Sequence, residues 1–293
     1  MINDKKTYQT RQFMLSNNYE IFHYKDDYLK EIALHHHDFY EIYMFISGQV
    51  TYDIEGKTYK LCSGDLLLIS PDELHQPIVN SGNYERIVLW INKNFVKEVS
   101  TEKNDLMKCF KLMKKDNKNL MRLEPNQSQK IRNLLEDISL SFVEKKFAYE
   151  IYASSLVKIL LIELARIIET CPDSLVMYHT ASKLIHSVIE YIDKNLQKQL
   201  TLEGIAKEFF ISKFYLSHIF KKTMGTTVYR YITQKRLILA KEFIVKGHMI
   251  KTVYLDCGYQ DYSSFFRMFK KEYGITPKEY LKYMTKQNEV ITK

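Results

Sequence analysis

Two nearly identical stretches of this chain restrict its fold more than any other feature of the sequence. IFKKTMG at residues 219–225 returns forty-nine positions later as MFKKEYG at residues 268–274. This shift aligns six identical residues: Phe220 with Phe269, Lys221 with Lys270, Lys222 with Lys271, Gly225 with Gly274, Thr227 with Thr276 and Tyr231 with Tyr280. This pattern indicates one structural unit that the chain uses twice.

Local signals in the first copy predict two short helices joined by a tight turn. Thr201 can cap a helix over LEGIAKEF, and Phe210-Ile211 can form the turn. Ser212 can cap a second helix that stops at Gly225, because glycine readily adopts the left-handed conformation that ends helices. Two such helices make a helix-turn-helix, whose second helix can lie in the major groove of DNA.

The second copy carries the same signals in the same order. Cys257-Gly258 ends a helix around IKTVYLD, Asp261 can cap the next helix, and that helix stops at Gly274. The charge of this part of the chain fits a polyanion: residues 176–293 hold 20 Lys and Arg against 10 Asp and Glu. The alternative is a pair of amphipathic helical hairpins whose lysines are merely solvated.

Helical periodicity separates a buried face from an exposed face on each second helix. The predicted core positions are Leu216, Ile219, Phe220, Phe265, Met268 and Phe269. The predicted base-reading positions are Lys213, Tyr215, Ser217, His218, Tyr262, Ser263, Phe266 and Arg267. Arg267 can pair with guanine through two hydrogen bonds, and Phe266 can contact a thymine methyl group. The positions predicted to bind phosphates are Lys221, Lys222, Lys270 and Lys271.

The first hundred residues have the pattern of short strands. EIYMFIS, QVTYDIE, KTYKL, DLLLIS and ERIVLWI are rich in β-branched and aromatic residues. Gly48, Glu55-Gly56, Ser63-Gly64 and the stretch at residues 81–83 separate them as predicted turns. Strands at this spacing predict a sandwich or a barrel.

The string HHHDFYEIYMFISG contains the most informative polar residues of this region. His35, His37, Glu41 and Tyr43 differ by even numbers, so they would share a face of one extended strand, and His75 follows the strand DLLLIS. The spacing is similar to the cupin metal motif, and such a set can hold Fe, Mn, Ni or Zn. Cupins carry glycines that are missing before His35 and near Glu73. We therefore expect polar pocket residues and no metal or other cofactor, with a metal site as the alternative.

Arg86 and Trp90 are the second pair of candidate ligand-binding residues. They lie four apart on YERIVLWI and so share a face, opposite to Ile87 and Leu89. Trp90 can stack on a sugar ring and Arg86 can hold a hydroxyl or carboxylate in the mouth of a barrel. The alternative places Trp90 in the core and Arg86 in a buried ion pair.

Two amphipathic helices are predicted between residues 126 and 170. The first presents Ile131, Leu134, Leu135, Ile138 and Phe142 on one face, and the second presents Tyr152, Leu156, Ile159, Leu160, Glu163 and Ile167. These stripes exceed what one small barrel can cover, so we expect a homodimer; the alternative is packing on the chain's own barrel. Residues 171–174, CPDS, are the predicted linker to the C-terminal part.

The C-terminal repeat resembles the AraC/XylS-type transcriptional regulators over about 100 residues. The motif GYxDxSxFFRxFKKxxGxTPxxY, here from Gly258 to Tyr280, carries the resemblance. One departure is the pair Tyr254 and Leu255, where the family usually has small apolar residues. The resemblance implies two helix-turn-helix units joined by a rigid helix over residues 227–246, with a cupin-like effector barrel in front.

These observations give an α+β protein with three parts. We expect a cupin-like ligand-sensing barrel at residues 1–98, a helical linker and dimerisation region at residues 99–175, and an all-α domain with two helix-turn-helix motifs at residues 176–293. The expected partners are double-stranded promoter DNA, a small effector that the family resemblance suggests is a sugar, RNA polymerase and a second copy of the chain.

The function predicted from these parts is a ligand-responsive, sequence-specific transcriptional regulator, an activator of carbohydrate-utilisation genes. The alternative is a cupin-type metalloenzyme with a helical appendage, whereas we expect no enzyme activity. The four cysteines lie far apart, as is typical of a reducing cytosol, and no apolar run suggests a leader or a membrane span, so we expect a cytoplasmic protein.

Overall fold

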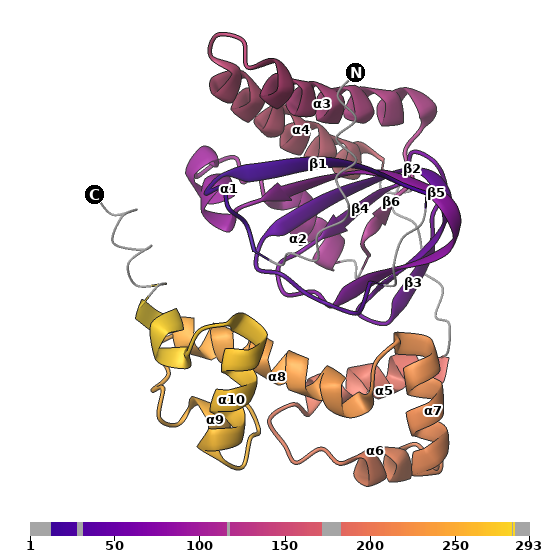
Figure 1. Cartoon of the computed structure of the whole chain (residues 1–293), viewed down its shortest axis with the longest axis vertical. Helices are drawn as coiled ribbons and strands as arrows, with labels where there is room; N and C mark the ends of the chain where they lie inside the picture. Colours follow the sequence, from indigo (N-terminus) through magenta and orange to yellow (C-terminus); the bar gives the residue numbers. More distant parts are fainter. Residues whose placement is uncertain (1–12, 28–31, 116–117, 172–182, 283, 285–293) are drawn as a thin grey trace. The chain divides into compact units, whose positions relative to one another are not determined.

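The computed structural model describes residues 13–27, 32–115, 118–171, 183–282 and 284 (Figure 1). The chain divides into two compact units, residues 1–180 and residues 181–293. The predicted boundary near residue 98 falls inside the first unit, so a separate helical region stays a prediction. Apart from Cys171, the predicted linker at residues 171–174 lies outside the described residues. Within the described ranges, no helix is long and apolar enough to cross a membrane.

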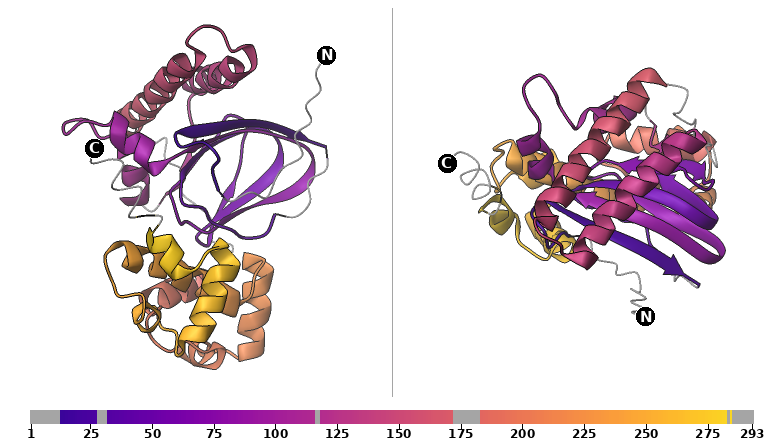
Figure 2. Two further views of the ribbon diagram at one scale, coloured as in Figure 1. Left: turned by 60° about the vertical axis from the view of Figure 1, so that its left-hand side comes forward. Right: turned by 90° about the horizontal axis from the view of Figure 1, so that it is seen from above.

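The first unit is built on an antiparallel sheet that curls into a barrel (Figures 1 and 2). Its strands are β1 (Tyr19–Asp26), β2 (Tyr40–Ile54), β3 (Lys57–Lys60), β4 (Leu66–Ile69), β5 (His75–Ile91) and β6 (Leu120–Met121). They follow the order β1-β5-β2-β4-β6, and β3 pairs with the far half of β2. The expected cupin-like β-barrel is confirmed in this architecture.

Two predicted turns are wrong, because they lie inside long strands. EIYMFIS and QVTYDIE form the single strand β2, and Gly48 is a bulge within it at φ 126°. The register between β2 and β5 shifts on both sides of this glycine, which bends the strand instead of ending it. A Cβ at Gly48 would lie 3.3 Å from the Tyr84 Cα, a tight contact, and the positive φ would strain any other residue there. Residues 81–83 likewise lie inside β5.

Both faces of the sheet are buried, because alternate residues of a strand point to opposite sides. On β2, Ile42 and Met44 belong to a hydrophobic cluster under the helices, whereas Tyr43 and Phe45 belong to the cluster inside the barrel. The interior is rich in aromatic and polar side chains. The outer face is aliphatic. A polar site in this unit can therefore form only on the inner side of the sheet.

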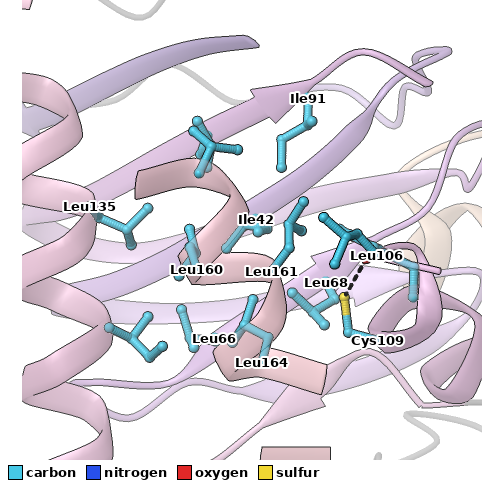
Figure 3. Packing of buried hydrophobic residues seen from close by; sticks show 14 of the residues in the cluster. Ile42, Leu66, Leu68, Ile91, Leu106, Cys109, Leu135, Leu160, Leu161 and Leu164 are labelled. Carbon is cyan, nitrogen blue, oxygen red and sulfur yellow. Dashed lines mark hydrogen bonds between the residues drawn. The ribbon is translucent and has the colours of Figure 1, made fainter. Parts of the chain in front are cut away.

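Helices cover the outer face of the sheet (Figures 1 and 2). They are α1 (Lys93–Val99), α2 (Lys108–Lys115), α3 (Pro125–Glu144) and α4 (Tyr149–Thr170). Figure 3 shows Leu135 of α3 and Leu160, Leu161 and Leu164 of α4 beside Ile42, Leu66 and Leu68 of the sheet. The two predicted middle helices therefore exist, and they pack on their own barrel.

The barrel covers only part of the stripe predicted on the second middle helix. Leu156, Leu160 and Ile167 are buried, whereas Tyr152 and Ile159 are 55% and 43% exposed. The buried face of α4 is centred instead on its small and aliphatic residues Ala153, Val157, Leu160, Leu161 and Leu164. The helix is apolar on more than one side, so periodicity alone did not decide which side meets the sheet.

The second unit is helical, with α5 (Lys183–Lys194), α6 (Leu202–Glu208), α7 (Lys213–Met224), α8 (Val228–Val245), α9 (Val253–Asp256) and α10 (Tyr262–Tyr273). Helix α8 runs between the pair α6–α7 at one end and the pair α9–α10 at the other (Figure 1). Of the predicted core positions, Leu216, Phe220, Phe265 and Phe269 are buried, and Ile219 and Met268 are partly buried. Two helix-turn-helix motifs are confirmed.

Candidate nucleic-acid interface and ligand cavity

Side-chain caps fix where both second helices begin. The Ser212 hydroxyl accepts a hydrogen bond from the Tyr215 backbone N–H at 3.1 Å, and Asp261 accepts one from Ser264 at 2.7 Å. Both helices end at a glycine in the left-handed conformation, Gly225 at φ 63° and Gly274 at φ 73°. The lengths and the ends of α7 and α10 thus follow from the short-range signals that the sequence repeats.

The predicted DNA-facing side chains lie on the outer surface of these helices. The exposed ones are Lys213, Tyr215, Ser217, His218, Lys221, Lys222, Tyr262, Ser263, Arg267, Lys270 and Lys271. Phe266 is half-buried and contacts the Tyr262 ring, with the ring centroids 5.9 Å apart. Lys213 forms an ion pair with Glu203 of α6. All predicted positions except the half-buried Phe266 are thus exposed to solvent, which contact with DNA requires.

One exposed aromatic residue escaped the sequence analysis. Phe214 is 77% exposed on the first turn of α7, and the forty-nine-residue shift places it on Ser263, which was named as a reader. Consistent use of the repeat would therefore have found it. Its large apolar ring is unusual for a solvated surface and adds a stacking or methyl-contacting group to the first copy.

The two copies border one shared groove of about 520 Å³. Its lining includes Ser217 of α7, Tyr229 and Thr233 of α8, and Ser264 and Met268 of α10. Helices α7 and α10 thus border the same hollow, but of the predicted DNA-facing residues only Ser217 lies in its lining.

Arg236 of α8 joins the two copies at the base of this groove, and sequence reasoning missed it. Its guanidinium donates hydrogen bonds to the backbone oxygens of Leu196, at 2.9 Å, and Lys198, at 2.7 Å, just before the first copy. It also lies over the Tyr259 ring of the second copy, 5.7 Å from the centroid. Burial lowers the pKa of Arg236. A long-range contact of this kind leaves no local signal in the sequence.

The first unit gathers all the predicted ligand residues around one small cavity. Its lining comprises Tyr24, Ile32, His35, His37, Glu41, Tyr43, Tyr52, Pro77, Tyr84, Arg86, Val88 and Trp90, with His75 packed beside the two other histidines. The cavity volume is about 20 Å³, roughly the room for one water molecule. Three lining residues, Tyr24, Tyr52 and Tyr84, were not predicted from the sequence. Tyr84 could have been predicted, because it lies two positions before Arg86 on the same face of the strand.

Arg86 and Trp90 are already engaged by neighbouring residues. Arg86 is buried, donates to Asp26 at 2.6 Å and packs over the Tyr24 and Tyr84 rings. The Trp90 indole N–H donates to Glu41 at 2.8 Å. Tyr43 and Tyr84 share a hydrogen bond between their hydroxyls. These contacts fit the alternative in which Arg86 belongs to a buried ion pair and Trp90 to the core, while both side chains still line the cavity.

Each of the three cavity histidines has one ring nitrogen fixed by a backbone oxygen. Nδ1 of His35 bonds Ala33 at 3.0 Å, Nδ1 of His37 bonds Phe39 at 3.0 Å, and Nδ1 of His75 bonds Glu73 at 2.8 Å. A carbonyl oxygen only accepts, so Nδ1 carries the proton in every case. Burial, followed by the neighbouring imidazoles, lowers the pKa of His75 well below its usual value and that of His35 to about 4. Nε2 of both rings is therefore a lone-pair donor near neutral pH.

Comparison with known protein families agrees with both halves of this description. Residues 205–283 match the model for a helix-turn-helix domain, and residues 17–157 match the model for an AraC-like ligand binding domain. The two matches coincide with the repeat and with the barrel together with most of its covering helices.

Individual relatives resemble the C-terminal part. Regulatory protein SoxS of Salmonella typhimurium is 33% identical over 99 residues, covering 33% of this chain and 92% of that relative. The Escherichia coli HTH-type transcriptional regulator YijO is 36% identical over 122 residues, which cover 40% of this chain but only 43% of YijO. Among solved structures, the C-terminal domain of AraT, a response regulator from Geobacillus stearothermophilus, is 27% identical at a TM-score of 0.35, covering 36% of this chain and 88% of that chain.

Two findings identify the family. The stretch similar to SoxS covers 92% of that relative, and residues 17–157, earlier in the chain, match the AraC-like ligand binding domain. The chain belongs to the AraC family and is a DNA-binding transcriptional regulator with a ligand-binding domain.

Proposed function

We propose that this regulator is sequence-specific and ligand-responsive, and that in the cytoplasm it activates genes for the use of its effector, a sugar. The observation that carries the DNA-binding part is the pair of capped helices α7 and α10, whose exposed faces hold the predicted readers and lysines. Two capped helices that face the same side can enter two successive major-groove segments, about 34 Å apart along one face of a duplex.

The side chains divide into readers and anchors under this proposal. Arg267 reads guanine, because its planar guanidinium can bond two acceptors of one base edge. Lys270 and Lys271 lie in the last turn of α10, as Lys221 and Lys222 do in α7. There they neutralise phosphates and set the register, which raises affinity for any duplex.

The effector proposal depends on a change in the barrel. A cavity of about 20 Å³ is far below the roughly 300 Å³ of a small-molecule site, so a sugar can enter only after lining side chains move. A ligand that binds only the opened barrel shifts the population toward that form. Because the cavity must enlarge before a sugar can bind, the barrel would have a closed and an open form, which differ in the packing around Trp90 and Arg86.

We also propose that the first unit pairs with a second copy through the end of the α3–α4 hairpin. Large apolar side chains are exposed there, where α3 ends and α4 begins: Leu140, Val143, Phe147, Ile151 and Tyr152. An apolar patch of this kind on a regulator that binds DNA fits a dimer recognising two half-sites. As an activator, the DNA-bound dimer would contact RNA polymerase.

Sedimentation of the full chain at micromolar concentration tests the pairing. We expect dimers for the wild-type protein and monomers for the double variant Val143→Asp with Ile151→Asp. Monomers for the wild-type protein with and without ligand would refute the pairing. The control Leu255→Asp changes an exposed apolar residue of the second unit and should leave the dimer intact.

A sequence-selection assay on the full chain, with and without candidate sugars, tests the proposed function. We expect one enriched site with two segments one helical turn apart, and a change of affinity for that site with the inducing sugar. Arg267→Ala should relax preference at one base position, whereas Lys270→Ala should weaken binding to all duplexes and flatten the salt dependence. Equal affinity for selected and random DNA at the same salt concentration would overturn the proposal.

A further inference from the structure

The strongest unassigned feature of the molecule is the set of ligand-forming atoms inside the barrel. His37, Glu41 and His75 each offer one nitrogen or oxygen atom, and these atoms lie within 4.8 Å of one another. The three residues are 4%, 6% and 0% exposed. They come from two neighbouring strands: His37 and Glu41 flank the start of β2, and His75 begins β5.

The histidine rings are held in the orientation that a metal ion requires. Their Nδ1–H groups are fixed by the backbone oxygens of Phe39 and Glu73, which leaves both Nε2 lone pairs pointing away from the backbone. The His37 ring also stacks on Phe39, with centroids 3.9 Å apart and planes 5° apart. A histidine that binds metal usually donates its other N–H in this way, because that bond sets the tautomer and the ring orientation.

These nitrogens are otherwise unsatisfied. Among the residues that the structure describes, Nε2 of His37 and Nε2 of His75 are buried without a hydrogen-bond partner. The nearest polar atom to the first is Glu41 Oε2 at 3.3 Å. Buried polar atoms without a partner are uncommon and costly, so two of them side by side indicate a missing ligand.

Size and charge decide what that ligand is. The cavity of about 20 Å³ accepts a single small particle and no organic molecule. Glu41 brings a buried carboxylate to it, and the nearest cationic side chain of the lining, Arg86, is paired with Asp26. A cation would balance the carboxylate and use both lone pairs, whereas one water molecule would balance no charge.

We propose that the barrel binds one divalent transition-metal ion through Nε2 of His37, Nε2 of His75 and the carboxylate of Glu41. Two imidazoles and one carboxylate suit Zn²⁺, Fe²⁺, Co²⁺ and Ni²⁺ better than Mg²⁺ or Ca²⁺, which prefer oxygen ligands. His35 is the candidate fourth ligand: its Nδ1 is fixed by Ala33, and its ring centroid lies 4.3 Å from that of His75. The ion would share residues with the proposed sugar site, because His35, His37 and Glu41 line the same cavity.

Binding of the ion would be felt by Trp90, the only tryptophan of the chain. The Trp90 N–H donates to Glu41 Oε2, so an ion that draws this carboxylate changes the tryptophan's hydrogen bond. Trp90 in turn contacts the rings of Phe22 and Phe39 at centroid distances of 4.8 and 4.6 Å. Tryptophan fluorescence therefore reports directly on the proposed site.

The test uses the full chain after dialysis against a chelator, with Co²⁺ as the probe. We expect one Co²⁺ per chain by equilibrium dialysis, a dissociation constant in the micromolar range or below, quenching of Trp90 and visible absorption from the bound ion. Zn²⁺ should displace Co²⁺ and raise the melting temperature of the first unit. No saturable binding, or binding that leaves Trp90 unchanged, would overturn the proposal.

Variants locate the ion. Glu41→Gln keeps the size of the side chain, and His75→Asn replaces the imidazole by a smaller polar group that lacks Nε2; each should weaken Co²⁺ binding by at least about 100-fold. His23→Asn, which alters an exposed histidine of β1, is the matched control and should bind as wild type. Binding that survives in Glu41→Gln and His75→Asn would show an adventitious site elsewhere. Should either variant fail to fold, the Trp90 quenching and the Zn²⁺-induced stabilisation of the wild-type protein still decide.

Discussion

The second helices of the two helix-turn-helix copies, α7 and α10, have the same length and the same kind of ends, but the turns before them differ. In the first copy, Phe210 takes the left-handed conformation at φ 54°, two residues before the cap Ser212. In the second, Gly258 takes it at φ 84°, three residues before the cap Asp261. The chain therefore tolerates a large side chain at one turn and has glycine at the other.

The surroundings of the two turns explain this difference. Phe210 is 95% exposed, so its side chain meets only solvent. A Cβ at Gly258 would lie 2.4 Å from the backbone oxygen of Leu196 and 2.9 Å from the Arg236 guanidinium. The second turn thus forms part of the joint between the copies, and the first turn does not. Identical motifs acquire different requirements once they are packed against the same helix.

The first helices differ as well, as the unusual pair Tyr254 and Leu255 suggested. Helix α6 has seven residues and a side-chain cap from Thr201, whereas α9 has four residues and no side-chain bond at its cap Thr252. Leu255 is 52% exposed, and the Tyr254 ring contacts Tyr262 of α10 edge to face. The shorter helix is held by aromatic contacts in place of a cap.

Substitution of Gly258 should have the largest effect of the variants that test this comparison of the two turns. Gly258→Ala should destabilise the second unit by more than about 2 kcal/mol, because it adds both a left-handed penalty and a collision with a backbone oxygen. Phe210→Gly should stabilise it by up to about 1 kcal/mol, since only the left-handed penalty is removed. Urea unfolding of the full chain, followed by circular dichroism, measures both. Equal destabilisation of the two variants would contradict the comparison.

Loss of the Arg236 contacts that join the two copies should have the next largest effect on stability. Arg236→Met keeps the apolar stem but leaves the Leu196 and Lys198 oxygens without their donor, at an expected cost of about 2–3 kcal/mol in unfolding free energy. Affinity for a site spanning two turns of DNA should fall more than affinity for either half alone. The exposed Arg230 of α8 supplies the control, and Arg230→Met should change stability by less than about 0.5 kcal/mol.

Helices α7 and α10 carry different residues at one equivalent position of the repeat, which allows a direct comparison of the two copies. The repeat places His218 and Arg267 at equivalent sites on α7 and α10, both exposed. Arg267→Ala should cost about 1–3 kcal/mol on the selected site, and His218→Ala about 0.5–1.5 kcal/mol, because a histidine offers one bond where arginine offers two. Binding titrations on the selected site and on random DNA distinguish reading from general affinity; equal losses would remove the distinction between the copies.

The caps should give the smallest effects and differ in their pH dependence. Ser212→Ala should cost about 1 kcal/mol at any pH. The backbone N–H of Ser264 holds the pKa of Asp261 below its ordinary value. Its contribution to stability is therefore present above the unfolded pKa of about 4 and is lost as the pH falls through the lower folded pKa. Asp261→Ser should remove that acid dependence, which unfolding curves between neutral and acidic pH would show.

The DNA-binding half was largely predictable because its signals are local. Ser212 and Asp261 act on residues three positions away, and Gly225 and Gly274 end helices by their own backbone freedom. The core of α7 and α10 followed from periodicity, with Phe220 and Phe269 fully buried. The positions of the predicted readers on exposed faces follow from the same geometry, while their contacts with DNA stay a prediction.

The barrel was predictable in class but not in detail. The sequence around Gly48 predicts a turn, yet Gly48 lies inside β2, because β5 pairs with β2 on both sides of it. The stripe predicted on α4 does not coincide with its buried face: Tyr152 and Ile159 are exposed, whereas Ala153 and Val157 are buried, because α4 is apolar on more than one side. Whether His37, Glu41 and His75 converge depends on how β2 and β5 pair, and the even spacing of the first two residues says nothing about the third.

The sequence by itself determined the elements that nearest neighbours along the chain control: the capped helices, their glycine ends, and the buried and exposed faces of the repeated unit. Only the tertiary structure decided the joint at Arg236, the requirement for glycine at position 258, and the buried cluster in which His37, Glu41 and His75 meet. The physical reason is distance along the chain. Caps and periodicity act within a turn or two of helix, whereas these contacts join residues that only the folded chain brings together.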